Sequence, residues 1–177
     1  MRKLLIVVDY QNDFVTGPLG SREAAEIKDR LLEKVRNFDG TVVYTKDTHN
    51  ADYLETQEGK NLPVPHCVKD EEGWMLVPEL EVLVQENAGI IYEKNTFGCI
   101  RLAEDIRELY EKETLESVEL IGVCTDICVI ANALLIKTFV PEVPVLVDAA
   151  CCAGVTPESH RRALDAMKVC QIQITEE

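Results

Sequence analysis

The sequence predicts an α/β protein of three layers, in which helices cover both faces of a doubly wound, six-stranded parallel sheet with a Rossmann-like arrangement. Short runs of branched apolar residues alternate with helical patterns along the chain. The first of these runs is apolar throughout, as in a strand buried on both faces. The 177 residues suffice for one core and contain no interdomain linker or repeat, so we expect a single domain over 1–177.

The first half of the chain predicts two strands and one helix. Residues 3–8 form a continuous apolar run, and residues 41–45 are rich in β-branched side chains, so both predict strands. Between them, residues 21–36 follow a helical period that ends in the turn at 37–40. One face of this helix carries Ala24, Ile27, Leu31 and Val35. Residues 48–88 are rich in glycine and proline and are expected to be irregular, and a connection of this length is usually functional.

The second half repeats the alternation. Further strands are expected at residues 90–92, 118–123, 143–147 and 170–174. A helical period marks Leu102, Ile106 and Leu109, and the nearly all-apolar segment 126–139 predicts a central helix. Thr156 followed by Pro157 is a typical helix start, with a capping residue before proline at the first helical position.

Composition limits the partners and the compartment. The formal net charge is −14, which would repel nucleic acid and an anionic membrane surface. The N-terminal apolar run of about six residues is too short for a secretion signal, and no stretch approaches the roughly 20 apolar residues of a membrane span. The seven cysteines form no even framework. We therefore expect reduced thiols in a cytoplasmic protein.

Polar residues follow the ends of the first four predicted strands. They are Asp9, then Asp47 and His49, then Lys94, and finally the segment that contains Cys128. In an open parallel sheet, ligands bind outside the carboxyl ends of the strands. Any one of these residues is as consistent with a turn as with a site. Together they favour a site that gathers a carboxylate, an amine, a thiol and metal ligands.

Cys128 is the candidate nucleophile because it lies in the first turn of the predicted helix, with Thr125 or Asp126 as the cap. A helix N-terminus favours the thiolate and lowers the pKa of the thiol, and its N–H groups can bind an oxyanion. The spacing to Cys124 could instead indicate metal or redox chemistry, but a structural zinc site would need a second such pair. The other cysteines are interpreted as inert and structural: Cys67, Cys99, Cys151, Cys152 and Cys170.

Three ordered blocks resemble the isochorismatase-like cysteine hydrolases, in particular the nicotinamidase-related branch. They are Leu-Ile-Val-Val-Asp-Tyr-Gln-Asn-Asp-Phe at 5–14, Lys94 before Thr-Phe-Gly at 96–98, and Gly-Val-Cys-Thr-Asp-Ile-Cys-Val at 122–129. The superfamily includes nicotinamidases, N-carbamoyl amidohydrolases and isochorismatases. The resemblance implies strand order 3-2-1-4-5-6 and a cis peptide between Val123 and Cys124.

The resemblance also implies a reaction. Cys128 would be the nucleophile, Asp9 would accept its proton, Lys94 would favour the thiolate, and the backbone N–H groups of Cys124 and Cys128 would form the oxyanion hole. The expected activity is hydrolysis of a small, nicotinamide-like amide to an acid and ammonia through a thioacyl-enzyme. The alternatives are an N-carbamoyl, ureido or isochorismate-type substrate, a non-catalytic metal- or ligand-binding domain, and a thiol–disulfide exchanger.

Asp47, His49 and His66 resemble the metal site of nicotinamidases, in which the metal holds the ring nitrogen of the substrate. Two imidazoles and a carboxylate suit a divalent metal, with Zn²⁺ expected and Fe²⁺ or Mn²⁺ as alternatives. The competing interpretation is that these are loop residues without a metal. Asp52 or Glu55 could add a ligand.

Phe14 matches a pocket aromatic of the family, and Trp74 is a second candidate for lining the pocket. Each could equally be a packing residue. Pro63 stands where nicotinamidases usually carry a tryptophan, which leaves the ring substrate open. His160 is expected on the surface. The family commonly forms dimers or larger assemblies, so a homo-oligomer is expected.

Overall fold

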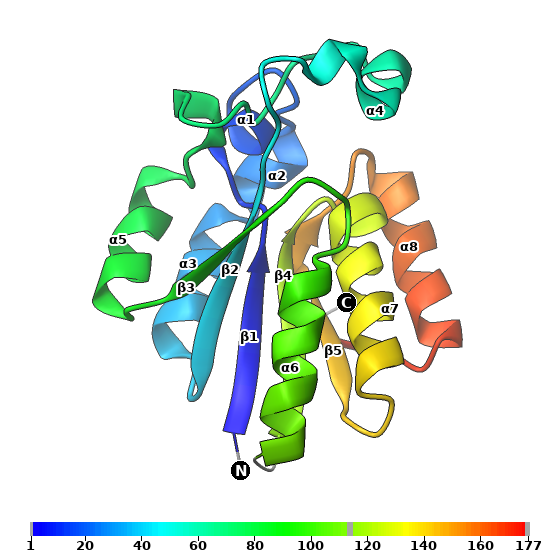
Figure 1. Cartoon of the computed structure of the whole chain (residues 1–177). Coiled ribbons are helices and arrows are strands. Elements are labelled where there is room, and N and C mark those ends of the chain that lie inside the picture. The colour runs from blue at the N-terminus through cyan, green and yellow to red at the C-terminus, as the bar shows by residue number, and fades with distance from the viewer. Residues whose placement is uncertain (1, 113–114, 176–177) are drawn as a thin grey trace.

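The computed structural model describes residues 2–112 and 115–175, and its centre is a six-stranded sheet of order β3-β2-β1-β4-β5-β6 (Figure 1). Every neighbouring pair is parallel. The strands are β1 (Arg2–Val8), β2 (Thr41–Asp47), β3 (Ile90–Lys94), β4 (Leu115–Val123), β5 (Val145–Ala153) and β6 (Gln173–Thr175). The predicted doubly wound α/β sheet and its strand order are confirmed.

Helices cover both faces of the sheet. They are α1 (Asn12–Val15), α2 (Arg22–Glu26), α3 (Lys28–Asn37), α4 (Gln57–Asn61), α5 (Pro78–Glu86), α6 (Ile100–Lys112), α7 (Ile130–Phe139) and α8 (Pro157–Val169). Helices α6, α7 and α8 pack on one face, whereas α3 and α5 pack on the other. The short helices α1 and α4 lie beyond the carboxyl ends of the central strands (Figure 1). In the described part of the chain, no helix has the length and apolarity to cross a membrane.

Strand β1 contributes side chains to the hydrophobic cores on both faces of the sheet. Its residues Leu4, Ile6 and Val8 belong to the core beneath α6, α7 and α8, whereas Leu5 and Val7 belong to the core beneath α3 and α5. Successive side chains of a strand point to opposite faces, so a strand covered on both sides is apolar at every position. The unbroken apolar run in the sequence therefore marks the centre of the sheet.

Two expectations about the first half are wrong. The single helix expected over 21–36 is divided at Ile27 into α2 and α3, and Ser21 caps α2 by accepting a hydrogen bond from the Ala24 N–H. The segment 48–88 is not irregular throughout, because it contains α4, α5 and the 3₁₀ turns Tyr53–Glu55 and Glu72–Trp74. Frequent glycine and proline hid these elements, although proline at the first turn of α5 is itself a helix-start signal.

The start of α8 agrees with the sequence. Thr156 is the N-cap, its hydroxyl accepts a hydrogen bond from the Ser159 N–H at 3.0 Å, and the Ser159 hydroxyl accepts one from the Thr156 N–H. This reciprocal pair satisfies backbone donors that a helix start otherwise leaves without a partner.

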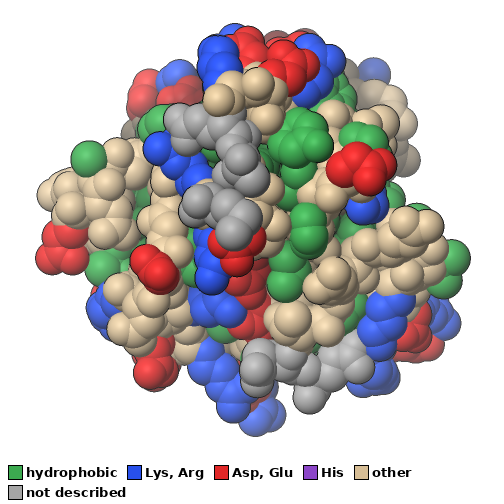
Figure 2. Space-filling view, turned by 90° about the horizontal axis from the view of Figure 1, so that it is seen from below, with side chains coloured by type: hydrophobic (Ala, Val, Ile, Leu, Met, Phe, Trp, Pro, Cys, Tyr) green, Lys and Arg blue, Asp and Glu red, His purple; other side chains and the backbone are tan. Residues whose placement is uncertain are grey.

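The amino edge of the sheet, at the other end of the molecule, carries interspersed acidic and basic side chains (Figure 2).

Candidate active site

The structure places Asp9, Lys94 and Cys128 together at the carboxyl edge of the sheet. Lys94 Nζ lies 2.7 Å from Asp9 Oδ2 and 3.5 Å from Cys128 Sγ. It also lies 3.4 Å from Asp47 Oδ1. All four side chains are buried. One ammonium group therefore links the candidate acid–base residue, the candidate nucleophile and a candidate metal ligand.

The ends of adjacent strands fix this geometry. Asp9 directly follows β1 with a positive φ of 47°, a left-handed conformation that aspartate tolerates better than most residues. Its Oδ1 accepts a hydrogen bond of 2.6 Å from the Thr45 hydroxyl on β2. Lys94 ends β3, and its carbonyl accepts a hydrogen bond from the Thr48 N–H. Asp9 and Lys94, more than 80 positions apart in the chain, thereby meet across the end of β2, because β1 and β3 flank that strand.

Cys128 lies in a π-helical turn, Thr125–Val129, that precedes α7. The Val129 N–H donates to the Cys124 carbonyl, five residues back, which widens the turn. The peptide between Val123 and Cys124 is cis, as the resemblance implied. The expected caps point elsewhere, because Thr125 bonds to a side chain of α8 and the Asp126 carboxylate accepts from the Val155 N–H. The expectation that either residue caps this turn is therefore wrong.

The pKa of the Cys128 thiol is raised well above its ordinary value, by burial and by the Asp9 charge. This is opposite to the lowering expected from a helix N-terminus. Burial also raises the pKa of Asp9, and the charges of Asp9, Cys128 and Asp47 raise that of Lys94 in spite of its burial. These directions favour a neutral thiol beside the ammonium of Lys94, with the Asp9 carboxyl as a hydrogen-bond partner of the thiol.

Four ligand-type side chains form a second group beside the first. Ligand atoms of Asp47, His49, Glu58 and His66 all lie within 4.8 Å of one another. His49 Nε2 is 3.1 Å and His66 Nε2 is 3.5 Å from Asp47 Oδ2. Glu58 comes from α4, which sequence analysis did not find, so its role was missed.

Sequence analysis suggested Asp52 or Glu55 as the added ligand, but both are exposed and lie outside the group. The signal that could have found Glu58 is the start of α4. There Thr56 accepts a hydrogen bond from the Gly59 N–H and begins the short helix that turns Glu58 inward.

The donor set suits a divalent metal. Two imidazoles and two carboxylates are ligands that Zn²⁺, Fe²⁺ and Mn²⁺ accept. His66 Nδ1 lies 2.9 Å from the Val64 carbonyl, a contact that fixes the ring and leaves Nε2 for a ligand bond. Although burial opposes ionisation, hydrogen bonds from His49 and His66 hold the pKa of Asp47 below its usual range. The carboxylate is therefore available as an anionic ligand.

Gln11, between β1 and α1, and Asp13, in α1, support this group. Gln11 is fully buried, its Nε2 donates to the Asp47 carbonyl at 2.9 Å, and its Oε1 accepts from the Asp47 N–H at 2.8 Å. Asp13 accepts a hydrogen bond of 2.7 Å from the Cys67 N–H, next to His66. Neither role was assigned from sequence, although both residues lie in the first motif block.

A cavity of about 460 Å³ opens onto Cys128 and onto three of the four ligand residues, Asp47, Glu58 and His66. Its walls are mainly apolar and include Phe14, Leu62, Phe97, Ile127 and Val155. The structure thus places Phe14 in the cavity wall, where its ring meets the His66 ring with 5.5 Å between centroids.

Trp74 packs elsewhere. Lys46 Nζ lies 3.0 Å from the centroid of its ring, and its Nε1 donates to Thr48 at 2.8 Å. Trp74 does not line the cavity, as sequence analysis expected, but packs beneath Lys46, because the 3₁₀ turn that it ends directs the indole toward β2.

Comparison with known proteins agrees with this geometry. The isochorismatase domain model matches residues 3–177. The chain belongs to the isochorismatase family. The predicted family, including its nicotinamidase-related branch, is confirmed.

Individual relatives span nearly the whole chain. A nicotinamidase/pyrazinamidase structure from Bacillus subtilis superposes with a TM-score of 0.84 at 27% identity, covering 98% of this chain and 99% of that one. A Pyrococcus horikoshii pyrazinamidase in complex with zinc has a TM-score of 0.80 at 26% identity and full coverage of both chains. The nicotinamidase of Schizosaccharomyces pombe is 26% identical over 98% of this chain and 92% of its own length.

Proposed function

We propose that this chain hydrolyses a small nicotinamide-like amide to a carboxylic acid and ammonia, with Cys128 as the nucleophile. The observation that carries the proposal is the contact of one buried ammonium, Lys94, with both Asp9 and Cys128, and Cys128 lines an apolar cavity. A nucleophile, an acid–base group and a fixed cation together are the parts that covalent amide hydrolysis needs. The nicotinamidase relatives from yeasts and bacteria support the same reaction class.

The proposed reaction begins with proton transfer from Cys128 to Asp9 while Sγ attacks the amide carbonyl. Lys94 stabilises the negative charge that remains on the pair. The backbone N–H groups of Cys124 and Cys128 bind the oxyanion. The tetrahedral intermediate then breaks its C–N bond, and Asp9 returns the proton to the departing ammonia. A water molecule next attacks the thioester, Asp9 accepts one of its protons, and the acid leaves as the Cys128 thiol is reformed.

We further propose that Asp47, His49, Glu58 and His66 hold a divalent metal, with Zn²⁺ the favoured ion. A metal at this position would act as a Lewis acid that binds and orients a ring nitrogen of the substrate. The chain's own contribution is to place those ligands beside the cavity, with Gln11 fixing the Asp47 backbone from both sides. The apolar walls suit a flat ring, and the cavity volume of about 460 Å³ suits a small substrate.

The test is ammonia release from nicotinamide by metal-loaded protein, compared with Cys128→Ala. Cys151→Ala is the matched control, because Cys151 is a buried thiol that also lies beside a carboxylate. We expect Cys128→Ala to lower kcat by about 10⁴-fold or more, with unchanged folding and metal content, and Cys151→Ala to retain activity. Turnover by Cys128→Ala would refute the covalent mechanism. If the wild type releases no ammonia from nicotinamide but does so from an N-carbamoyl substrate, the amide assignment is wrong.

A further inference from the structure

The turn that carries Cys128 is attached to α8 by a partly buried hydrogen bond. Thr125 Oγ1 and His160 Nδ1 are 2.8 Å apart. Thr125 is fully buried, and His160 is half-buried on the second turn of α8 rather than on the surface, where sequence analysis expected it. A buried hydroxyl without a partner is costly, so this bond specifies how the turn and the helix pack.

A second bond attaches the same turn to the same region. The Val155 N–H, just before α8, donates to both carboxylate oxygens of Asp126, at 3.1 and 3.3 Å. Gly154 allows the close approach, because a Cβ at this position would lie 2.9 Å from the His160 Cβ. The two polar side chains of the π turn are therefore both directed outward to α8 and the loop before it.

The placement of these bonds relates them to the reaction. Thr125 follows Cys124 directly and precedes Cys128 by three residues, so it lies between the two residues proposed for the oxyanion hole. Helix α8 packs against the π turn, and the residues before it, Gly154 and Val155, line the cavity, whereas His160 does not line it. The hydrogen bond to Thr125 is the polar contact through which a change at His160 reaches the turn of the nucleophile.

We propose that His160 is a positioning residue, which holds Thr125 and thereby sets the orientation of the Cys128 thiol and of the backbone N–H groups around it. This inference rests on the proposed function for its link to turnover. A displacement of about 1 Å at a reacting group can lower the rate by about 100-fold. In the proposed function the substrate ring is held beside Phe14 and His66, which belong neither to the π turn nor to α8. Loss of the Thr125–His160 bond should therefore lower kcat more than it changes KM.

The experiment compares variants that remove the bond with variants that keep it. Thr125→Val and His160→Leu should each lower kcat by about 10- to 100-fold with KM changed by less than about twofold. Thr125→Ser keeps the hydroxyl, and His160→Asn places a polar atom near the position of Nδ1, so both should recover most of kcat. The double variant Thr125→Val/His160→Leu should lose no more than either single variant, because both remove one interaction.

Ser159→Ala is the matched control. It breaks the capping box at the start of α8 and so weakens the start of the helix, but it leaves the Thr125–His160 bond in place. Its kcat should equal that of the wild type. Equal losses of kcat in Ser159→Ala and His160→Leu would reduce His160 to a stability role and overturn the proposal. Full activity in a folded Thr125→Val would overturn it as well.

A substrate-independent measurement separates this inference from the proposed function. The rate of Cys128 alkylation by iodoacetamide, followed by peptide mass spectrometry, reports the exposure and orientation of the thiol. We expect Thr125→Val and His160→Leu to change this rate by at least about fivefold, and Thr125→Ser, His160→Asn and Ser159→Ala to leave it unchanged. If the wild type does not hydrolyse nicotinamide, the proposed function fails while this test still decides the role of His160. An unchanged alkylation rate in both bond-removing variants would refute it.

Discussion

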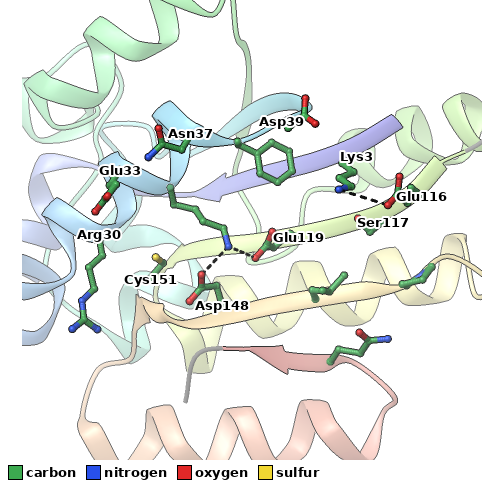
Figure 3. Close-up of a pocket in the computed structure, with 15 residues that line it drawn as sticks. Lys3, Arg30, Glu33, Asn37, Asp39, Glu116, Ser117, Glu119, Asp148 and Cys151 are labelled. Atoms are coloured by element: carbon green, nitrogen blue, oxygen red, sulfur yellow. Dashed lines mark hydrogen bonds and ion pairs between the residues drawn. The ribbon is translucent and has the colours of Figure 1, made fainter. Parts of the chain in front are cut away.

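Two lysines of this chain each lie between two carboxylates, but in different parts of the sheet. Lys34 of α3 contacts Glu119 at 2.6 Å and Asp148 at 2.9 Å (Figure 3). This group lies over the face of β4 and β5 in a hollow that Cys151 also lines. Burial, followed by the charge of Asp148, raises the pKa of the Cys151 thiol to about 12. The hollow thus contains the same kinds of group as the candidate active site.

Lys94 differs in what surrounds its ion pairs. Its side chain is 2% exposed, compared with 29% for Lys34, and it contacts a thiol at 3.5 Å. It lies at the ends of the strands, where the metal-ligand group and the apolar cavity also converge. A lysine, two carboxylates and a cysteine of raised pKa are therefore not sufficient for a site. Position at the carboxyl edge of the sheet distinguishes the two groups.

The strongest test exchanges each lysine for methionine. Lys94→Met removes the cation beside Asp9 and Cys128, so we expect kcat/KM to fall by about 10³-fold or more. Lys34→Met should leave kcat/KM within about twofold of the wild type, because Lys34 contacts neither the cavity nor its lining. The measurement is ammonia release at saturating metal, with circular dichroism to establish folding. If both folded variants lost kcat/KM to a similar extent, the loss would come from a general effect of the broken ion pairs on the sheet. The distinction between Lys94 and Lys34 would then be wrong.

A smaller effect tests the ligand group at the carboxyl edge. Glu58→Gln removes one carboxylate from the group, so we expect the affinity for Zn²⁺ to fall by about tenfold or more. Glu55→Gln is the matched control, since Glu55 lies three residues earlier and is exposed. Titration with a chromogenic chelator measures both affinities. A larger loss in Glu55→Gln than in Glu58→Gln would contradict the placement of α4 over the site.

The sequence predicted most strands of the sheet and the candidate residues Asp9, Lys94 and Cys128 at its carboxyl edge, for a physical reason. A strand buried on both faces must be apolar, and the residue that follows it is the first that can be polar, so Asp9 stands out as the end of such a run. Lys94 instead ends β3, a partly exposed strand at the edge of the sheet, and only its place at the end of a predicted strand marked it. The strand order was implied by the resemblance to the family and not by this pattern. Two boundaries were wrong, because the strands expected at 143–147 and 170–174 are Val145–Ala153 and Gln173–Thr175.

The features that were not predicted depend on tertiary contacts. Gln11 and Asp13 are positioned by backbone groups more than 35 positions away, and Glu58 by a helix of five residues. Periodicity cannot reveal such short elements. The raised pKa of Cys128 was mispredicted for the same reason, since burial depends on the complete fold and outweighs the local effect of a helix N-terminus.

The thiols offer a test of this last point. The pKa of Cys128 is raised, and alkylation consumes the thiolate, so its fraction increases about tenfold per pH unit below the pKa. In the metal-free protein we therefore expect the rate of Cys128 alkylation to rise about tenfold per unit from about pH 7 to pH 9, without a plateau. Cys151 should show the same dependence, because its pKa is about 12. A plateau in the alkylation rate of Cys128 below about pH 8 would contradict the raised pKa of this thiol. The helix N-terminus would then outweigh burial in setting that pKa.

The smallest effect concerns stability, and it belongs to Lys34. Lys34→Met leaves Glu119 and Asp148 near each other without their shared cation, and Asp148 is almost fully buried. Because the lysine is partly exposed, we expect a loss of about 1–2 kcal/mol, between the values for surface and buried pairs. Chemical denaturation measures this loss. Lys34→Met/Glu119→Gln/Asp148→Asn should recover much of it, because no unpaired charge remains. A triple variant no more stable than Lys34→Met would mean that the packing of the Lys34 side chain, rather than its charge, stabilises this face of the sheet.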